Sequence, residues 1–216
     1  MNIMNDEKLR PFIEIGLVAG VFFVVRELFG SVIYRSQIAE VFCLFLITFL
    51  LKRRNSSWRE LGFRLPDRWL KAIGYTILCV VTIGLVFNFI VQPMFPQGAN
   101  DINAGTGISF NHMLFQLIVI GLGTAAIGEE LLFRGFVLNN LNDFLGRNAL
   151  GTAGAVVLQA VMFGLLHSGT QGMVSAGVIG LILGVFYILA NRNLLVVMAA
   201  HAVPDALSII SSYQAQ

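Results

Sequence analysis

Long apolar runs constrain the fold of this chain more than any other feature of its sequence. They lie near residues 11–33, 37–51, 70–92, 111–138, 150–167, 173–190 and 194–212. A helix needs about 20 mainly apolar residues to cross a bilayer, and backbone polar groups in lipid must be satisfied within a helix or a closed barrel. The sequence therefore predicts an all-α, polytopic transmembrane helix bundle of about seven spans. Six or eight spans stay open, because the second run is short.

The composition supports a membrane environment. The chain is 56% hydrophobic and only 12% charged, whereas about 25% of the residues in typical soluble domains are charged. Both cysteines, Cys43 and Cys79, fall inside apolar runs, where a free thiol behaves as a small hydrophobic group.

Charged residues are distributed unevenly, and their placement predicts the topology. The stretch 52–71 is rich in Lys and Arg, which favours a cytoplasmic loop under the positive-inside rule. The N-terminus then lies in the cytoplasm as well, and the turn-rich loop 93–110 lies on the opposite side. No aromatic stacking platform accompanies the basic loop, so we expect no nucleic-acid partner. We divide the chain into three N-terminal spans, residues 1–110, and a four-helix membrane core, residues 111–216.

The first polar cluster is Gly128-Glu129-Glu130-Leu131-Leu132-Phe133-Arg134-Gly135, in the fourth apolar run. Ionisable side chains within a span are costly and normally face a cavity or a partner. On a helix Glu130 and Arg134 are four residues apart and meet on one face, which leaves Glu129 free. An unpaired carboxylate in a partly dry site suits a general base. The alternative is a salt bridge at a helix end, with Glu129 facing lipid headgroups.

The second cluster is Phe163-Gly164-Leu165-Leu166-His167. If the chain reverses near Arg147, antiparallel helices place His167 nearly level with Glu129. A carboxylate and an imidazole at one depth could share a water molecule. Taken alone, a histidine near a span end is more often an interfacial residue than a catalyst, which is the alternative for His167.

The third cluster is His201-Ala202-Val203-Pro204-Asp205, early in the last run. The spacing of His201 and Asp205 places both on one helix face. Pro204 removes a backbone hydrogen bond and is expected to bend the helix there. A role in helix packing alone is the alternative.

The first two runs contain further charged residues. Glu14, Arg26, Glu27 and Glu40 either pair with one another or line a cavity. The sequence does not decide between these possibilities.

In order along the chain, Glu-Glu-x-x-x-Arg at 129–134, Phe-x-x-x-His at 163–167 and His-x-x-x-Asp at 201–205 resemble the three motifs of a known family. That family is the CAAX prenyl endopeptidase and bacteriocin-processing family of intramembrane proteases, and the resemblance covers about residues 111–212. It implies hydrolysis of a peptide bond inside the membrane by a catalytic four-helix core. It also implies site residues: Glu129 as the base, His167 as its partner, His201 with Asp205 on the oxyanion side, and Glu130 and Arg134 as supporting residues.

Asp205 departs from the family pattern, in which the last motif position is often Asn. An Asn amide can donate a hydrogen bond to an oxyanion, whereas an ionised carboxylate only accepts. Asp205 is therefore either protonated or orients His201 by accepting its ring N–H, the role that we favour. For the three motifs to meet at one depth, we also expect Ser168–Gly172 to dip into the bundle.

The leading hypothesis is a glutamate-dependent intramembrane endopeptidase that uses no cofactor and no metal. A zinc-dependent protease on the same fold is the nearest alternative, because two histidines and several carboxylates could bind Zn²⁺, although the chain lacks His-Glu-x-x-His. A non-catalytic transport or immunity protein is the alternative from another class.

The expected partners are membrane lipid and a peptide or lipidated protein substrate. Prenylated C-terminal peptides, bacteriocin leaders and peptide pheromones all stay open as substrates, and so does the oligomeric state. The expected location is a prokaryotic plasma membrane.

Overall fold

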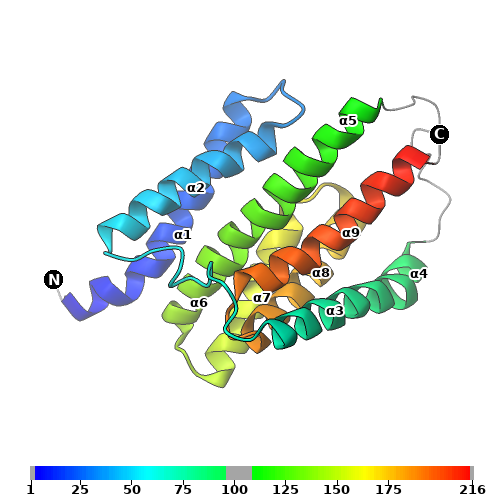
Figure 1. Cartoon of the computed structure of the whole chain (residues 1–216). Coiled ribbons are helices and arrows are strands. Elements are labelled where there is room, and N and C mark those ends of the chain that lie inside the picture. The colour runs from blue at the N-terminus through cyan, green and yellow to red at the C-terminus, as the bar shows by residue number, and fades with distance from the viewer. Residues whose placement is uncertain (1–2, 96–108, 215–216) are drawn as a thin grey trace.

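The computed structural model describes residues 3–95 and 109–214, which form helices and connecting turns with no β-strand among them. Figure 1 shows the helices as rods that lie roughly side by side, with a long green rod near the middle of the bundle. The predicted all-α membrane bundle is confirmed for this part of the chain.

The helices of the N-terminal part, the middle rod and the C-terminal part follow in chain order. The N-terminal part contains α1 (Ile3–Leu28), α2 (Arg35–Arg53) and α3 (Trp69–Val86), and α3 continues through η1 (Phe87–Val91) into α4 (Gln92–Met94). The green rod runs from α5 (Phe110–Phe115) through the π-helical segments η2 (Gln116–Glu129) and η3 (Leu131–Val137) to α6 (Leu138–Leu145). The last three helices are α7 (Ala149–Leu165), α8 (Gly169–Leu189) and α9 (Leu194–Gln214).

Each predicted span coincides with one of these rods. Four rods are long and apolar enough to cross a membrane, namely Trp69–Met94, Phe110–Leu145, Gly169–Leu189 and Leu194–Gln214, whereas Ala149–Leu165 is a shorter apolar helix. The predicted loop 52–71 is narrower, since α2 ends at Arg53 and α3 begins at Trp69. The predicted loop 93–110 falls mostly on residues 96–108, outside the described residues.

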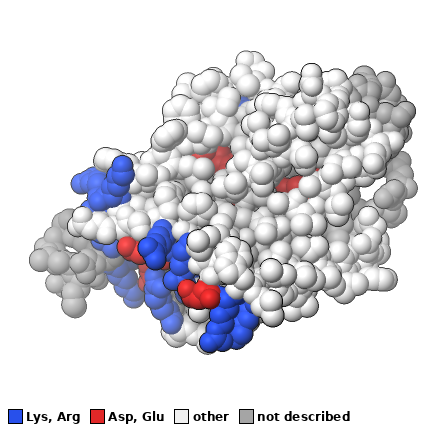
Figure 2. Space-filling view, in the orientation of Figure 1, with Lys and Arg blue, Asp and Glu red and all other residues white. Residues whose placement is uncertain are grey.

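The outer surface is apolar, as lipid requires. Phe45, Leu70, Phe89 and Leu150 are between 72% and 88% exposed, which would be costly in water but not in a bilayer. Figure 2 shows a broad white surface, with Lys and Arg gathered toward the end of the bundle where the α2–α3 connection lies. The chain is therefore an integral membrane protein with one strongly basic end.

Glycines allow α7 and α8 to pack closely against each other. A side chain at Gly164 would come within 2.6 Å of the Met173 carbonyl oxygen, and one at Gly184 would come within 2.7 Å of the Gln159 amide nitrogen. Small residues at such contacts let helix backbones approach each other in membranes. The close approach also brings the Gly180 carbonyl within reach of polar side chains on neighbouring helices.

The α2–α3 connection is held against the turn between α8 and α9. The Leu194 amide donates to the Gly62 carbonyl at 2.9 Å. Gly62 has a φ of +101°, and a side chain there would overlap the Arg192 carbonyl, so this position requires glycine. The polar turn at 191–193 is therefore a packing partner of the basic connection.

Candidate active site

Glu129 and His167 line one cavity of about 220 Å³ within the bundle. Glu129 is the last residue of η2, and His167 lies in the short turn between α7 and α8. The full lining is Phe22, Ser36, Gln37, Glu40, Glu129, Leu132, Phe133, Phe163, Leu166, His167 and Ser168. Since a water molecule takes up about 30 Å³ in the liquid, the cavity has room for several. The structure thus brings together the carboxylate and the imidazole that the sequence predicts to lie level.

His167 reaches the cavity because α7 is short. With 17 residues, α7 is about 25 Å long, and Figure 1 shows the α7–α8 turn lying short of the ends of α5 and α9. The expected dip of Ser168–Gly172 is replaced by this turn, because Gly169–Gly172 already form the start of α8. The depth of His167 therefore comes from where α7 ends.

The imidazole of His167 is oriented by the backbone. Its Nδ1 lies 2.9 Å from the Phe163 carbonyl oxygen, and because a carbonyl only accepts, we assign the ring proton of the neutral form to Nδ1. Its Nε2 then keeps a lone pair that can accept a hydrogen bond from water. This hydrogen bond gives the Phe-x-x-x-His spacing a structural reason, because it links residues one helical turn apart.

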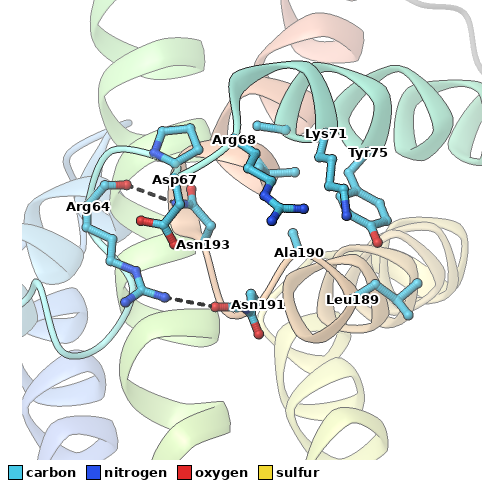
Figure 3. A pocket seen from close by; sticks show the side chains of 12 residues that line it. Arg64, Asp67, Arg68, Lys71, Tyr75, Leu189, Ala190, Asn191 and Asn193 are labelled. Carbon is cyan, nitrogen blue, oxygen red and sulfur yellow. Dashed lines mark hydrogen bonds between the residues drawn. The ribbon is translucent and has the colours of Figure 1, made fainter.

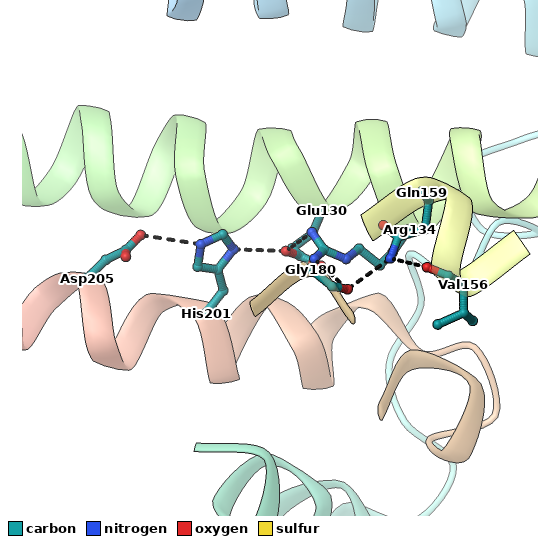
Figure 4. Close-up of polar contacts among 7 residues, drawn as sticks. All are labelled: Glu130, Arg134, Val156, Gln159, Gly180, His201 and Asp205. Atoms are coloured by element: carbon teal, nitrogen blue, oxygen red, sulfur yellow. Dashed lines mark hydrogen bonds and ion pairs between the residues drawn. The ribbon is translucent and has the colours of Figure 1, made fainter. Parts of the chain in front are cut away.

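A second polar group lies between the green rod and α9, as Figure 4 shows. We call it the polar row, and it consists of Glu130, Arg134, His201 and Asp205. Glu130 and Arg134 are fully buried and form an ion pair of 2.7 Å. The same Glu130 oxygen lies 2.8 Å from Nδ1 of His201, whose Nε2 lies 3.6 Å from Asp205. Arg134 also donates to the Gly180 carbonyl at 3.2 Å, so the row ties η3, α8 and α9 together.

Phe163 lies between the cavity and this polar row. Its ring centroid is 4.9 Å from that of His167 and 6.4 Å from that of His201. The guanidinium of Arg134 lies 4.8 Å from the centre of the same ring, a cation–π distance. Phe163 therefore contacts residues of both polar groups and connects them.

The predicted site residues therefore fall into two groups rather than one. Glu129 and His167 line the cavity, whereas His201 and Asp205 are not among its lining residues. The hydrogen bond that we expected Asp205 to accept from His201 is made by Glu130 instead. Sequence spacing could not reveal this, because Glu130 and His201 lie on different helices, whereas Asp205 is one turn away on the same helix.

Glu40 is the polar residue of the cavity that sequence reasoning left undecided. It comes from α2, is 5% exposed and lines the cavity with Glu129. Of the two possibilities left open for the charged residues of the first two helices, Glu14 follows neither, since it forms its ion pair with Arg54 just after α2. The signal that could have identified Glu40 is its place inside an apolar run, since such residues are usually functional.

A larger cavity of about 450 Å³ lies at the basic end of the bundle. Figure 3 shows Arg64, Arg68 and Lys71 around it, beside Asp67. Its lining includes no histidine and no second carboxyl group, so it lacks the acid–base pair that hydrolysis of a peptide bond requires. The smaller cavity with Glu129 and His167 is the candidate active site.

The donor set around Glu129 does not form a metal site in the described structure. Among residues 3–95 and 109–214, no three or more His, Cys, Asp or Glu side chains come together closely enough to bind a metal ion. His167 directs its Nδ1 at the Phe163 carbonyl, and His201 directs its Nδ1 at Glu130. A reaction without a metal stays a prediction.

Comparison with known proteins matches the part of the chain that carries these motifs. Residues 110–207 match the family model described as type II CAAX prenyl endopeptidase Rce1-like. The match runs from the start of α5 into α9 and includes Glu129, His167, Phe163 and the row from Arg134 to Asp205. Neither the comparison with curated proteins nor that with solved structures gave a match.

Proposed function

We propose that this chain is a CAAX-type intramembrane endopeptidase that uses Glu129 and His167 to activate a water molecule. The match of residues 110–207 to the Rce1-like family model supports the reaction class. The observation that supports the proposal is the shared cavity, which holds both side chains beneath an apolar outer surface. Peptide bonds within a bilayer are shielded from bulk water, so an enzyme acting there needs a pocket that admits and orients water.

Glu129 and His167 have different roles in the proposed reaction. Glu129 accepts a proton from water, while His167 holds the water by accepting a hydrogen bond at Nε2. The water oxygen bonds to the carbonyl carbon, and the tetrahedral intermediate then breaks its carbon–nitrogen bond. The leaving amine takes the proton from Glu129, which restores the carboxylate for the next cycle.

The polar row helps to position the side chain of His167 in the catalytic cavity. The family resemblance assigns His201 and Asp205 to the oxyanion side, but their contacts favour a positioning role here. Glu130 holds the His201 ring, and both Arg134 and His201 lie against Phe163. Phe163 in turn provides the carbonyl that orients His167. Loss of the row should therefore disturb the alignment of His167 rather than remove a reacting group.

An apolar cavity of about 230 Å³ adjoins the site and favours a substrate with a large apolar group near the cleaved bond. It shares Phe22, Leu132, Phe133 and Leu166 with the catalytic cavity. Its lining contains no charged side chain, so it suits a prenyl chain or a bulky aliphatic side chain. Prenylated C-terminal peptides fit this description, as do apolar segments of bacteriocin leaders or peptide pheromones.

The proposal is tested by comparing membrane peptides in cells that carry the wild type, Glu129→Gln or Glu60→Gln at matched protein levels. Glu60 is an exposed carboxylate bonded to Ser56 on the α2–α3 connection, so its variant is the matched control. We expect uncleaved peptides to accumulate with Glu129→Gln but not with Glu60→Gln. Identical peptide profiles for the wild type and folded Glu129→Gln would favour a binding or transport protein over an enzyme.

A further inference from the structure

Glu40 is a buried carboxyl group that the described structure leaves unsatisfied. The residue is 5% exposed, and its Oε1 has no hydrogen-bond partner among the described residues. Native proteins leave few such groups, because taking a polar group out of water without a hydrogen bond is unfavourable. A buried and unpartnered carboxyl group in a cavity therefore calls for a functional reason.

Glu40 lines the same cavity as the water-activating pair. Ser36, Gln37 and Glu40 form the α2 wall of the cavity that Glu129 and His167 line. The Glu40 carboxyl lies directly against Gly128, where an added side chain would overlap its Oε1 and come within 3.0 Å of its Cδ. Glycine at 128 thus lets this carboxyl group reach the backbone immediately before Glu129.

The surroundings of Glu40 favour its protonated form. It belongs to none of the ion pairs among the described residues, and the charged group that shares its cavity is another carboxylate, Glu129. Two neighbouring carboxylates in a poorly solvated site do not both ionise readily. A protonated carboxyl group, unlike a carboxylate, can donate a hydrogen bond.

The reaction lacks an obvious donor on its oxyanion side. Asp205 replaces the amide that is often found at this motif position, and an ionised carboxylate cannot donate. His201 has its Nδ1 on Glu130, and neither His201 nor Asp205 lines the cavity. A tetrahedral intermediate formed there needs a donor from another part of the wall. Ser36 and Gln37 on α2 are half-buried and Ser168 is exposed, whereas Glu40 is buried beside Gly128.

We propose that Glu40, in its protonated form, donates the hydrogen bond that stabilises the oxyanion. This inference rests on the proposed function. When water bonds to the carbonyl carbon and gives a proton to Glu129, the carbonyl π electrons move onto oxygen, which accepts the hydrogen bond from Glu40. The proton stays on Glu40 throughout. The carbonyl re-forms as the carbon–nitrogen bond breaks and the amine takes its proton from Glu129.

Three variants of Glu40 distinguish a carboxyl group that donates a hydrogen bond in the reaction from one that is only buried. Gln keeps a hydrogen-bond donor of similar shape, Leu keeps the volume without any polar atom, and Ala removes both. The substrates are synthetic copies of the peptides that accumulate with Glu129→Gln, and the proteins are purified and placed in lipid nanodiscs. Turnover, KM and unfolding temperature are measured for each variant, with Glu60→Gln as the control.

We expect Glu40→Gln to keep kcat within about tenfold of the wild type, and Glu40→Leu and Glu40→Ala to lower it by about 10²–10³-fold, as loss of one oxyanion donor does elsewhere. KM should change little. Because Leu removes an unsatisfied buried polar group, Glu40→Leu should unfold at the wild-type temperature or above it, which separates lost catalysis from lost folding.

Two results would overturn the inference. Full activity in Glu40→Leu would show that the carboxyl group takes no part in the reaction, and equal losses in Glu40→Gln and Glu40→Leu would show that an ionised carboxylate is required instead. Both differ from failure of the proposed function, in which Glu129→Gln itself leaves cleavage intact.

Discussion

Replacing Arg134 by Met should lower the free energy of unfolding by about 3 kcal/mol, because it strands the charge of Glu130 in a dry interior. Both side chains of this pair are 0% exposed, and breaking a buried ion pair by removing one partner typically costs about 3–5 kcal/mol. We expect the lower end of this range for two reasons. Glu130 keeps its contact with Nδ1 of His201 at 2.8 Å, and the Gly180 carbonyl keeps the hydrogen bond from Gln159 at 2.8 Å.

The chain offers a matched control for this change. Arg147 and Asp143 form an ion pair with the same four-residue spacing, but their side chains are 58% and 36% exposed. Arg147→Met should therefore cost only about 0–1 kcal/mol. Reversible unfolding in mixed detergent micelles, followed by circular dichroism, measures both losses under one two-state treatment.

A double variant completes the test. In Arg134→Met with Glu130→Gln, the stranded charge is gone, while the Gln carbonyl can still accept from His201. We expect a coupling energy of about 1–3 kcal/mol between the two changes, as found for residues in one polar network. Equal losses for Arg134→Met and Arg147→Met, or strict additivity in the double variant, would refute the reasoning about burial.

Three further predictions concern the cavity. Gly128→Ala should lose activity and about 1–3 kcal/mol of stability, because its side chain would overlap the Glu40 carboxyl. Gly74→Ala is the control: no atom lies within 4 Å of the added carbon, so this variant should be neutral or stabilising in the same unfolding assay. His167→Leu should abolish peptide cleavage while changing stability by less than about 1 kcal/mol, since the ring is half-buried and its hydrogen bond is to a backbone carbonyl; a stability loss as large as that of Arg134→Met would contradict this. Cleavage by protein dialysed against a strong chelator should stay within about twofold of the untreated rate. A loss of cleavage that added Zn²⁺ restores would instead favour the zinc-dependent alternative.

Much of the fold could be predicted from hydropathy, because lipid imposes a single requirement on every span. The largest error in span length is in the fourth rod, predicted to end at 138 and observed to end at Leu145. The extension contains Asn139, which is 5% exposed and accepts a hydrogen bond from Arg192 as well as donating to Tyr187. Polar residues that are satisfied by other helices look like a span end in the sequence, although the helix continues.

The site could be predicted where its contacts are local, or where antiparallel helices place two residues at one depth, as with Glu129 and His167. The pair Glu130–Arg134 follows from a four-residue spacing on one helix, and so does the nearness of His201 to Asp205. The contact between His201 and Glu130 joins residues 71 positions apart, so it depends on helix packing that no local spacing encodes. Glu40 lies on the second helix with no motif around it, and only its place in the cavity indicates a role.

Glu129 and His167 should face one water-accessible cavity within the bilayer, and cysteine accessibility measures this directly. The native Cys43 and Cys79 are buried and provide an unreactive background. In proteoliposomes, a small charged thiol reagent should label Glu129→Cys and His167→Cys, and should leave Glu130→Cys unlabelled because Glu130 is 0% exposed. Protection of positions 129 and 167, or labelling of position 130 at the same rate, would contradict the account.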